Sequence, residues 1–590
     1  MALIFDLETD GFLEVCTKIH CLVIKDTETG EVLECSDEFC NLQAGLRLLT
    51  KGDVIVGHNI IKFDIPVIQK LYPWFKVDES KVLDTLVCSR LIWSNVGDID
   101  ATLVQQGKLP SKLWGSQSLA AWGYRLMEYK GDFSGPWETF SQEMLDYCVQ
   151  DVEVTHKLYQ KIIDKNYSQQ AIELEHKVAN ICAKMERSGW PFDKAGAASL
   201  YAELAQKRDD ILKSMQETFE PIIEKRVSEK TGKPLKDKVI EFNPSSRKQI
   251  ADRLTAKYGW KPKEFTPNGQ PKIDETVLKA LDYPEAQTLA EYFLLEKRVG
   301  QLAEGNNAWL KLEREGLIHG AYNPNGAVTG RATHQTPNLA QVPAVRSPYG
   351  NECRRLFGVR PGFTLVGCDL SGLELRCLAH FMSRWDDGQY GETVINGKQS
   401  DGTDIHTVNQ RAAGLSTRDQ AKTFIYAFLY GAGDEKIGSV VGGGSKEGKR
   451  LKSAFLAATP SLAKLRDAVA EASKRGYLLG LDGRHLHVRS EHAALNTLLQ
   501  SAGALISKQW LVELVNEAEA RGLVWNEDWS GDYSMCGWVH DEVQIAVKEN
   551  YAEEFGKMVV EAAYKAGEHF GFKVPIGAEY CTGRNWAETH

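Results

Sequence analysis

The sequence lacks any run of about 18 or more apolar residues, so it predicts no membrane-spanning helix and no membrane partner. Its first residues, Met-Ala-Leu-Ile-Phe-Asp-Leu-Glu, carry neither a basic region nor an Arg/Ser-rich segment, and we expect no signal or transit peptide. Twelve cysteines are scattered over 590 residues without a C-x-x-C pair, which argues against a disulfide framework. No internal repeat or low-complexity tract interrupts the chain. These absences predict a multidomain globular protein of a reducing cytoplasm.

The charge balance is acidic overall but basic in one place. The chain has 70 basic and 80 acidic residues, for a net charge of −10, which by itself argues against a nucleic-acid partner. Residues 225–263, however, contain twelve Lys or Arg against four acids. A stretch of this kind suits either a bound phosphate backbone or a solvated surface loop, and its composition alone does not separate the two.

The spacing of apolar residues changes twice along the chain. Up to about residue 165, short apolar runs alternate with helical patterns, which is typical of an α/β domain. Residues from about 170 to 315 have the apolar spacing of long helices, and we expect 231–265 to interrupt them as a loop. Strand patterns return after residue 320, at 363–368 and 535–547, with long helical patterns between them.

A first group of carboxylates lies in the N-terminal region. Asp6 and Glu8 alternate along an apolar strand, so both side chains share one face, where a divalent cation would offset their repulsion. Asp64 follows another apolar strand, and Tyr147 and Asp151 lie one turn apart on an expected helix. In this order the patterns D-x-E, N-x3-F-D and Y-x3-D resemble the three motifs of DEDD-type 3′→5′ exonucleases of the Tyr subclass.

That resemblance implies hydrolysis assisted by two metal ions. Asp6, Glu8, Asp64 and Asp151 would be the metal ligands, and Tyr147 would orient the attacking water. A further acid of this region, Asp84 in Leu-Asp-Thr, is expected to be a helix N-cap rather than a ligand.

A second group of acids lies far downstream. Asp369 ends an apolar strand that turns into a helix carrying Glu374, whereas Asp541 and Glu542 interrupt an apolar run that has the pattern of a hairpin. An acidic hairpin tip is usually a solvated turn, but acids on two neighbouring strands would form a site for a pair of cations.

A helix expected between these acids combines cations with aromatic rings. Arg418, Lys422, Tyr426 and Tyr430 recur every four residues and therefore share one face, and Ser416 or Thr417 can cap the helix. Two cations followed by two rings suit a triphosphate with its sugar and base.

These residues resemble family A (Pol I-like) DNA polymerases, in particular those of T-seven-type podophages, and the resemblance runs from the first residues to the last. Residues 369–376 are similar to motif A, 418–431 to motif B and 539–542 to motif C. The resemblance implies a replicative DNA-directed DNA polymerase of a bacteriophage, with a proofreading 3′→5′ exonuclease, in the cytoplasm of the bacterial host. Its substrates would be primer-template DNA and dNTPs, with helicase-primase and single-strand-binding proteins as expected partners.

The resemblance also implies a role for each residue. Asp369 and Asp541 would hold two Mg²⁺ ions, with Glu542 a weaker participant; two more ions would serve the exonuclease, and Mn²⁺ could substitute. Nucleotide contacts would come from Arg418, Lys422, Tyr426, Tyr430, His406 and Glu374, with Glu374 excluding the ribose 2′-OH and Tyr426 allowing chain termination by ddNTPs. The minor groove of the primer-template would be contacted by Arg331, Arg484, Gln500 and His540.

The implied architecture is an α/β multidomain chain in which a ribonuclease-H-like exonuclease domain precedes a right hand. We expect the exonuclease at 1–168, the thumb at 169–320, and palm and fingers at 321–590 with the fingers at about 406–479. The podophage relatives carry a long thumb insertion that captures host thioredoxin. This chain has only a short Lys-rich connection between Phe219 and Phe242, including Thr231–Leu235, so we expect no thioredoxin binding and direct contact of the basic stretch with DNA.

Two other functions need to be weighed. A single-subunit RNA polymerase would share the palm acids and a similar motif B, but Glu374 and the exonuclease acids argue against it. An inactive DNA-binding scaffold would have no reason to keep both sets of acids.

Overall fold

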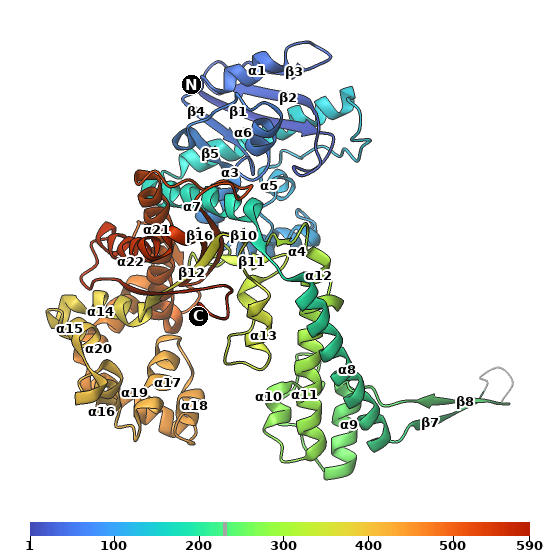
Figure 1. The fold of residues 1–590 in the computed structure, drawn as a ribbon, viewed down its shortest axis with the longest axis vertical. Helices are drawn as coiled ribbons and strands as arrows, with labels where there is room; N and C mark the ends of the chain where they lie inside the picture. Colours follow the sequence, from blue (N-terminus) through green and yellow to red (C-terminus); the bar gives the residue numbers. More distant parts are fainter. Residues whose placement is uncertain (228–232) are drawn as a thin grey trace.

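A five-stranded sheet forms the core of the N-terminal region, at the top of Figure 1. The structure is a computed structural model that describes residues 1–227 and 233–590. The strand order is β3-β2-β1-β4-β5, and β1 runs antiparallel to β2 but parallel to β4. The strands are β1 (Ala2–Thr9), β2 (Ile19–Asp26), β3 (Val32–Ser36), β4 (Val54–Gly57) and β5 (Val82–Asp84).

Alternation along β1 divides the core of this region into two layers. Leu3, Phe5 and Leu7 pack on the layer that contains α1 (Leu42–Leu49) and α2 (Asp64–Leu71). Ile4 packs in the layer of α6 (Gln142–Asp164). Asp6 and Glu8 therefore share the α6 side of the sheet, as the period of two predicts.

Helix α7 (Gln169–Ser188) connects the N-terminal region to the rest of the chain. It contacts α3 (Thr85–Ile92) on one side and the long helix α21 (Ala494–Ala520) on the other. Asp84 caps α3 by accepting hydrogen bonds from the backbone of Leu86 and Val87, so its predicted capping role is confirmed.

A four-stranded antiparallel sheet, ordered β15-β16-β12-β17, forms the centre of the molecule. Its strands are β12 (Phe363–Ser371), β15 (Tyr533–Val539), β16 (Glu542–Lys548) and β17 (Gly577–Gly583). Helix α22 (Ala552–His569) contacts β12 and β17 and also packs against α21. The predicted α/β character of the chain is confirmed by these two sheets.

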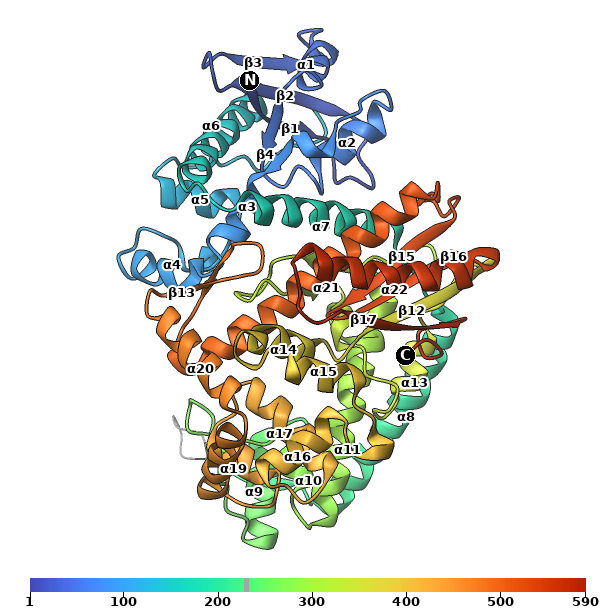
Figure 2. The same ribbon diagram turned by 90° about the vertical axis from the view of Figure 1, so that its left-hand side faces the viewer.

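Two helical limbs extend downward from the central sheet in Figures 1 and 2. One consists of α16 (Ile405–Ala413), α17 (Arg418–Leu429), α18 (Asp434–Ser439), α19 (Ser445–Ala458) and α20 (Pro460–Ser473). The other is built on the paired helices α8 (Lys194–Thr218) and α11 (Pro284–Val299), with α9 (Arg247–Tyr258) and α10 (Glu275–Lys279) near its end. Its end has a small core of its own, which includes Phe219, Phe242 and Leu254.

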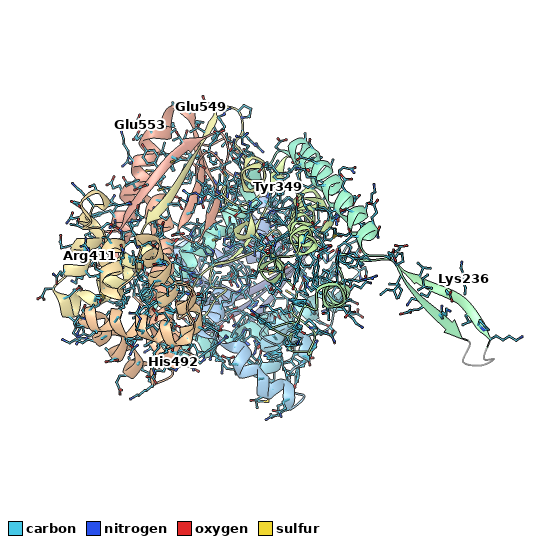
Figure 3. All side chains as sticks on the ribbon, turned by 90° about the horizontal axis from the view of Figure 1, so that it is seen from below. Lys236, Tyr349, Arg411, His492, Glu549 and Glu553 are labelled. Atoms are coloured by element: carbon cyan, nitrogen blue, oxygen red, sulfur yellow. The ribbon has the colours of Figure 1, made fainter. Side chains whose placement is uncertain are left out.

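The expectation that 231–265 is a loop was wrong. The strands β7 (Ile222–Val227) and β8 (Pro234–Ile240) pair in an antiparallel hairpin, and α9 follows with a cap from Ser246. Helix α9 forms because Ile250 and Leu254 bury one apolar stripe. The prediction of a loop rested on the Lys, Pro and Gly content of the segment and did not consider this spacing. Figure 3 shows Lys236 on this hairpin, far from the body of the molecule. Residues 228–232, which include Lys230 and Thr231, lie outside the described part.

Shorter elements complete the chain. They are α4 (Val96–Gln105), α5 (Leu119–Leu126), β6 (Trp190–Pro191), α12 (Trp309–Leu312), β9 (Leu317–Ile318), β10 (Ala321–Asn323), β11 (Thr333–Gln335), α13 (Gly350–Arg355), α14 (Leu373–Asp386), α15 (Gln389–Asn396), β13 (Tyr477–Leu479) and β14 (His485–His487). Among the described residues, no helix is both long enough and apolar enough to cross a membrane.

Candidate active sites

The downstream acids meet on two neighbouring strands of the central sheet. Asp369 on β12 lies directly opposite Glu542 on β16, and the backbone N–H of Leu370 donates to the carbonyl of Asp541 at 3.0 Å. Asp541 lies at the tip of the β15–β16 hairpin, where His540 has a left-handed backbone with φ of 58°. The buried apolar residues of β12 and β16 fix the register, so the three carboxylates are held at one end of these two strands.

Burial and mutual repulsion perturb these carboxylates. Burial, followed by the charge of Glu542, raises the pKa of Asp369 to about 7, and burial with the charge of Glu374 raises the pKa of Asp541 to about 6. Burial acts in the same direction on Glu542, but hydrogen bonds from His590 and Trp586 and the charge of Arg354 outweigh it and lower its pKa.

His590 was not found by sequence reasoning, although it contacts two of the three acids. Its Nδ1 lies 3.1 Å from Glu542 Oε2 and 3.5 Å from Asp369 Oδ2. Trp586 Nε1 donates to the other oxygen of Glu542, as does Gln544 Nε2 at 2.8 Å. A single histidine after the last strand carries no periodic or motif signal, so only the fold could reveal it.

Helix α17 presents the predicted cationic and aromatic face. Thr417 caps it in a reciprocal capping box with Gln420, which fixes its first turn. Arg418 Nε donates to Asp404 at 3.0 Å, and Lys422 is exposed one turn later. The ring centroid of Tyr426 is 6.2 Å from that of His406, whose Nδ1 is buried without a hydrogen-bond partner.

A cavity of about 120 Å³ lies between Asp541 and Tyr430, the residue that follows α17. Its lining combines residues of motif-like segments far apart in the sequence: Arg331, Glu374, Tyr430, His540 and Asp541. The hydroxyl of Tyr430 donates to Glu374 Oε1 at 2.9 Å. Gly503 and Ala504 of α21 form another wall, and Gln500 lies one turn before Ala504 on the same helix.

Arg484 does not reach this cavity, so its predicted contact with DNA needs correction. Its side chain is 2% exposed and is paired with Asp482 and Glu175 at 2.7 Å each. Lys508 also pairs with Glu175, which completes a buried cluster of two cations and two acids between α7, α21 and the β13–β14 segment. A guanidinium that is buried and paired in this way is not accessible to a base.

The N-terminal acids form a second, separate cluster on the α6 side of the first sheet. Burial and the charge of Asp151 raise the pKa of Asp6 to about 7, and burial with the charge of Asp6 raises that of Glu8 to about 10. Asp64, at the start of α2, is 4% exposed, and burial with the charge of Asp6 raises its pKa well above the usual range.

Asp151 and Tyr147 complete the cluster from α6. One oxygen of Asp151, Oδ1, is buried without a partner, and the other pairs with the ammonium of Lys130. The same ammonium lies 4.5 Å from the centroid of the Tyr147 ring. Lys130 belongs to a segment without helical or strand periodicity, and sequence reasoning did not find it.

Both clusters fit divalent cations by the chemistry of their donors. Each holds several buried or half-buried carboxylates whose pKa values are raised, first by burial and then by the charges of neighbouring acids. Carboxylate oxygens are the ligands that Mg²⁺ and Mn²⁺ prefer. Asp369 and Asp541 would hold the cations of one site, and Asp6, Glu8, Asp64 and Asp151 those of the other.

Comparison with known proteins agrees with this arrangement. The family model for DNA polymerase family A matches residues 209–588. The chain is 41% identical to the DNA-directed DNA polymerases of Enterobacteria phage T3 and of Escherichia phage T7, in alignments that cover 100% of each chain. These alignments extend over 715 positions, against 590 residues here, so the relatives carry segments that this chain lacks.

A solved structure shows the same fold. The POL domain of Pol1 from M. smegmatis, in complex with DNA primer-template and dNTP, superposes with a TM-score of 0.74 at 19% sequence identity, over 100% of this chain and 96% of that one. The expected fold class, in which an α/β exonuclease-like region precedes a polymerase domain, is confirmed. The match over residues 209–588 and the identity to both phage enzymes show that the chain belongs to DNA polymerase family A.

Proposed function

We propose that this chain is a replicative DNA-directed DNA polymerase with a 3′→5′ proofreading exonuclease, each activity served by one acid cluster. The observation that carries the proposal is the pairing of Asp369 with Glu542 at the Asp541–Glu542 tip, where Asp541 lines one cavity with Tyr430 at the end of α17. In this reading residues 1–168 form the exonuclease domain, 169–320 the thumb, and 321–590 the palm and fingers, with the fingers at about 406–479.

The polymerase reaction joins a primer 3′-oxygen to the α-phosphorus of a dNTP and releases pyrophosphate. Two Mg²⁺ ions bound by Asp369 and Asp541 would lower the pKa of the 3′-hydroxyl and stabilise the leaving pyrophosphate. Arg418 and Lys422 would neutralise the triphosphate, with His406 beside them, and the Tyr426 ring would pack against the nucleotide.

Sugar selection follows from the contact between Tyr430 and Glu374. The hydrogen bond holds the Glu374 carboxylate at the wall of the cavity next to Asp541. A ribose 2′-hydroxyl placed there would meet a group already satisfied and fixed, so dNTPs would be favoured over rNTPs.

The exonuclease would hydrolyse the last phosphodiester of a mispaired primer. Asp6, Glu8, Asp64 and Asp151 would hold two metal ions there, and Tyr147 would orient the attacking water. The separation of the two clusters, on different sheets, means that a primer end must transfer between them.

The protruding β7–β8 hairpin is proposed to contact the DNA backbone. Its described residues include Lys225, Arg226, Lys233, Lys236 and Lys238, all exposed, against only Glu224 and Asp237. Because the connection is short, we propose that this chain works without thioredoxin, and that the hairpin supplies salt-dependent processivity. Phage helicase-primase and single-strand-binding proteins, in the cytoplasm of a bacterial host, would be its replication partners.

A primer-template assay with Mg²⁺ tests the proposal. With all four dNTPs the primer should lengthen, and without them it should shorten from its 3′ end. Preferential incorporation of rNTPs, or neither lengthening nor shortening, would contradict it.

A further inference from the structure

Lys130 contacts the N-terminal acid cluster but does not belong to any of the three motif-like segments. Its ammonium pairs with one oxygen of Asp151 and lies 4.5 Å from the centroid of the Tyr147 ring. The side chain is only 24% exposed. It therefore touches both a predicted metal ligand and the residue predicted to orient the attacking water.

The backbone that carries Lys130 is held in place from two sides. Gln150 Nε2 donates to the carbonyl of Tyr129 at 2.9 Å, which ties the segment to α6. A Cβ atom at Gly123 of α5 would come within 3.0 Å of the Lys130 backbone nitrogen, so glycine permits this close approach. The backbone at Lys130 is thus held against both α5 and α6.

Lys130 pairs with an acid of the cluster itself. Other lysines near α6 differ: Lys25 pairs with Glu153 and Lys157 with Glu128, acids that do not belong to the cluster. Only Lys130, among the lysines of the described residues, pairs with one of the cluster's four acids.

We propose that Lys130 is a catalytic residue of the exonuclease centre, whose ammonium binds a non-bridging oxygen of the scissile phosphate. Asp151 is also an expected metal ligand. When a metal ion is bound, the ion compensates the charge of Asp151, and Lys130 is free to turn to the phosphate. The inference rests on the proposed exonuclease function.

A cation at this point would stabilise the charge that develops during hydrolysis. In the hydrolysis a bond forms between the water oxygen and phosphorus, with loss of a proton from the water to solvent, while the bond from phosphorus to the 3′-oxygen breaks. The electron pair of that bond stays on the 3′-oxygen, which takes up a proton from solvent. Negative charge grows on the non-bridging oxygens in between, and a preorganised ammonium stabilises it. Lys130 keeps its own proton throughout.

Binding in the presence of a non-catalytic cation gives the first test. The affinity of a single-stranded oligonucleotide is measured by fluorescence anisotropy with Ca²⁺ in place of Mg²⁺, so that the carboxylates are compensated, and with either a normal or an uncharged methylphosphonate linkage at its 3′ end. Lys130→Met should weaken binding of the normal oligonucleotide about tenfold and leave the methylphosphonate unchanged. Equal effects on both oligonucleotides, or none on either, would overturn the proposal.

Single-turnover degradation with Mg²⁺ gives the second test. Lys130→Met should slow removal of the 3′ nucleotide by roughly 100-fold, the cost of losing one transition-state donor, whereas Lys130→Arg should keep part of the rate. Lys157→Met is the matched control and should behave like the wild type, and primer extension should be unchanged in all variants, which shows that they fold.

The remaining outcomes are equally decisive. Wild-type degradation by Lys130→Met, or full recovery of its rate at higher Mg²⁺, would overturn the role in phosphate binding. If the wild-type chain itself degrades no DNA, the proposed exonuclease function fails, and that result is distinct from a failure of Lys130 alone.

Discussion

The hydroxyl of Tyr430 donates to Glu374 Oε1 at 2.9 Å, joining the end of one helix to the start of another across the cavity that contains Asp541. Tyr430 follows the last turn of α17, and Glu374 lies in the first turn of α14. The bond therefore links the end of α17 to the start of α14.

Loss of this bond should weaken sugar selection. Glu374→Ala should raise the efficiency of rNTP incorporation relative to dNTP by roughly 10- to 200-fold, because the wall opposite the 2′-position is removed. Tyr430→Phe should have a smaller effect in the same direction. The ratio of kcat/KM for dCTP and CTP measures both, and an unchanged ratio in Glu374→Ala would contradict the assignment.

Tyr426 should make the polymerase sensitive to chain terminators. Its hydroxyl is proposed to support the incoming nucleotide where a ddNTP lacks its 3′-hydroxyl, so Tyr426→Phe should discriminate against ddNTPs more strongly than the wild type. Primer extension with mixed dNTP and ddNTP reports the difference. Strong discrimination against ddNTPs by the wild-type chain would contradict this prediction.

His590 should contribute to the polymerase site without affecting the exonuclease. His590 contacts both Glu542 and Asp369. His590→Ala should therefore raise the Mg²⁺ concentration needed for half-maximal primer extension by about 10- to 100-fold, as expected for a residue that orients metal ligands. Degradation of single-stranded DNA serves as the control. Equal loss of both activities would indicate a general folding defect instead.

The acid cluster of the N-terminal region should destabilise the metal-free protein at high pH. The folded pKa of Asp6 is about 7, above its unfolded value, so the folded state binds the proton more tightly and loses stability as the pH rises from about 4 to 7. In EDTA, Asp6→Asn should therefore stabilise the chain at pH 8, by at most on the order of 4 kcal/mol, and much less at pH 5.

Thermal unfolding at the two pH values provides the measurement. Asp10 is a suitable control, because hydrogen bonds from Thr17 outweigh burial and lower its pKa, so Asp10→Asn should not stabilise at pH 8. An equal change in stability on Asp6→Asn at both pH values would show that the pKa of the Asp6 carboxyl is not raised in the folded state.

Most of the chemistry could be predicted from the sequence because it lies on regular elements. Asp6 and Glu8 follow strand alternation, Tyr147 and Asp151 follow helical spacing, and the face of α17 follows a period of four. The residues missed by sequence reasoning, Lys130 and His590, lie outside such periods and reach their partners only through tertiary packing.

Arg484 shows the opposite failure. The family resemblance implied a DNA contact, but nothing in the local sequence reports that Glu175, more than 300 positions earlier, lies against it. Burial depends on which helices meet, in this case α7 and α21. The hairpin β7–β8 was missed because its exposed strands carry lysines, and composition alone resembles that of a loop.

Each acid cluster should be removable without loss of the other activity. The measurement is single-turnover processing of one matched and one mismatched primer-template by the wild-type chain, by Asp369→Ala/Asp541→Ala and by Asp6→Ala/Glu8→Ala. We predict that the first double variant still shortens the primer but cannot extend it, and that the second still extends a matched primer but cannot remove a mismatch. Extension that persists without Asp369 and Asp541, or loss of both activities in either double variant while it remains folded, would contradict two independent sites in this polymerase.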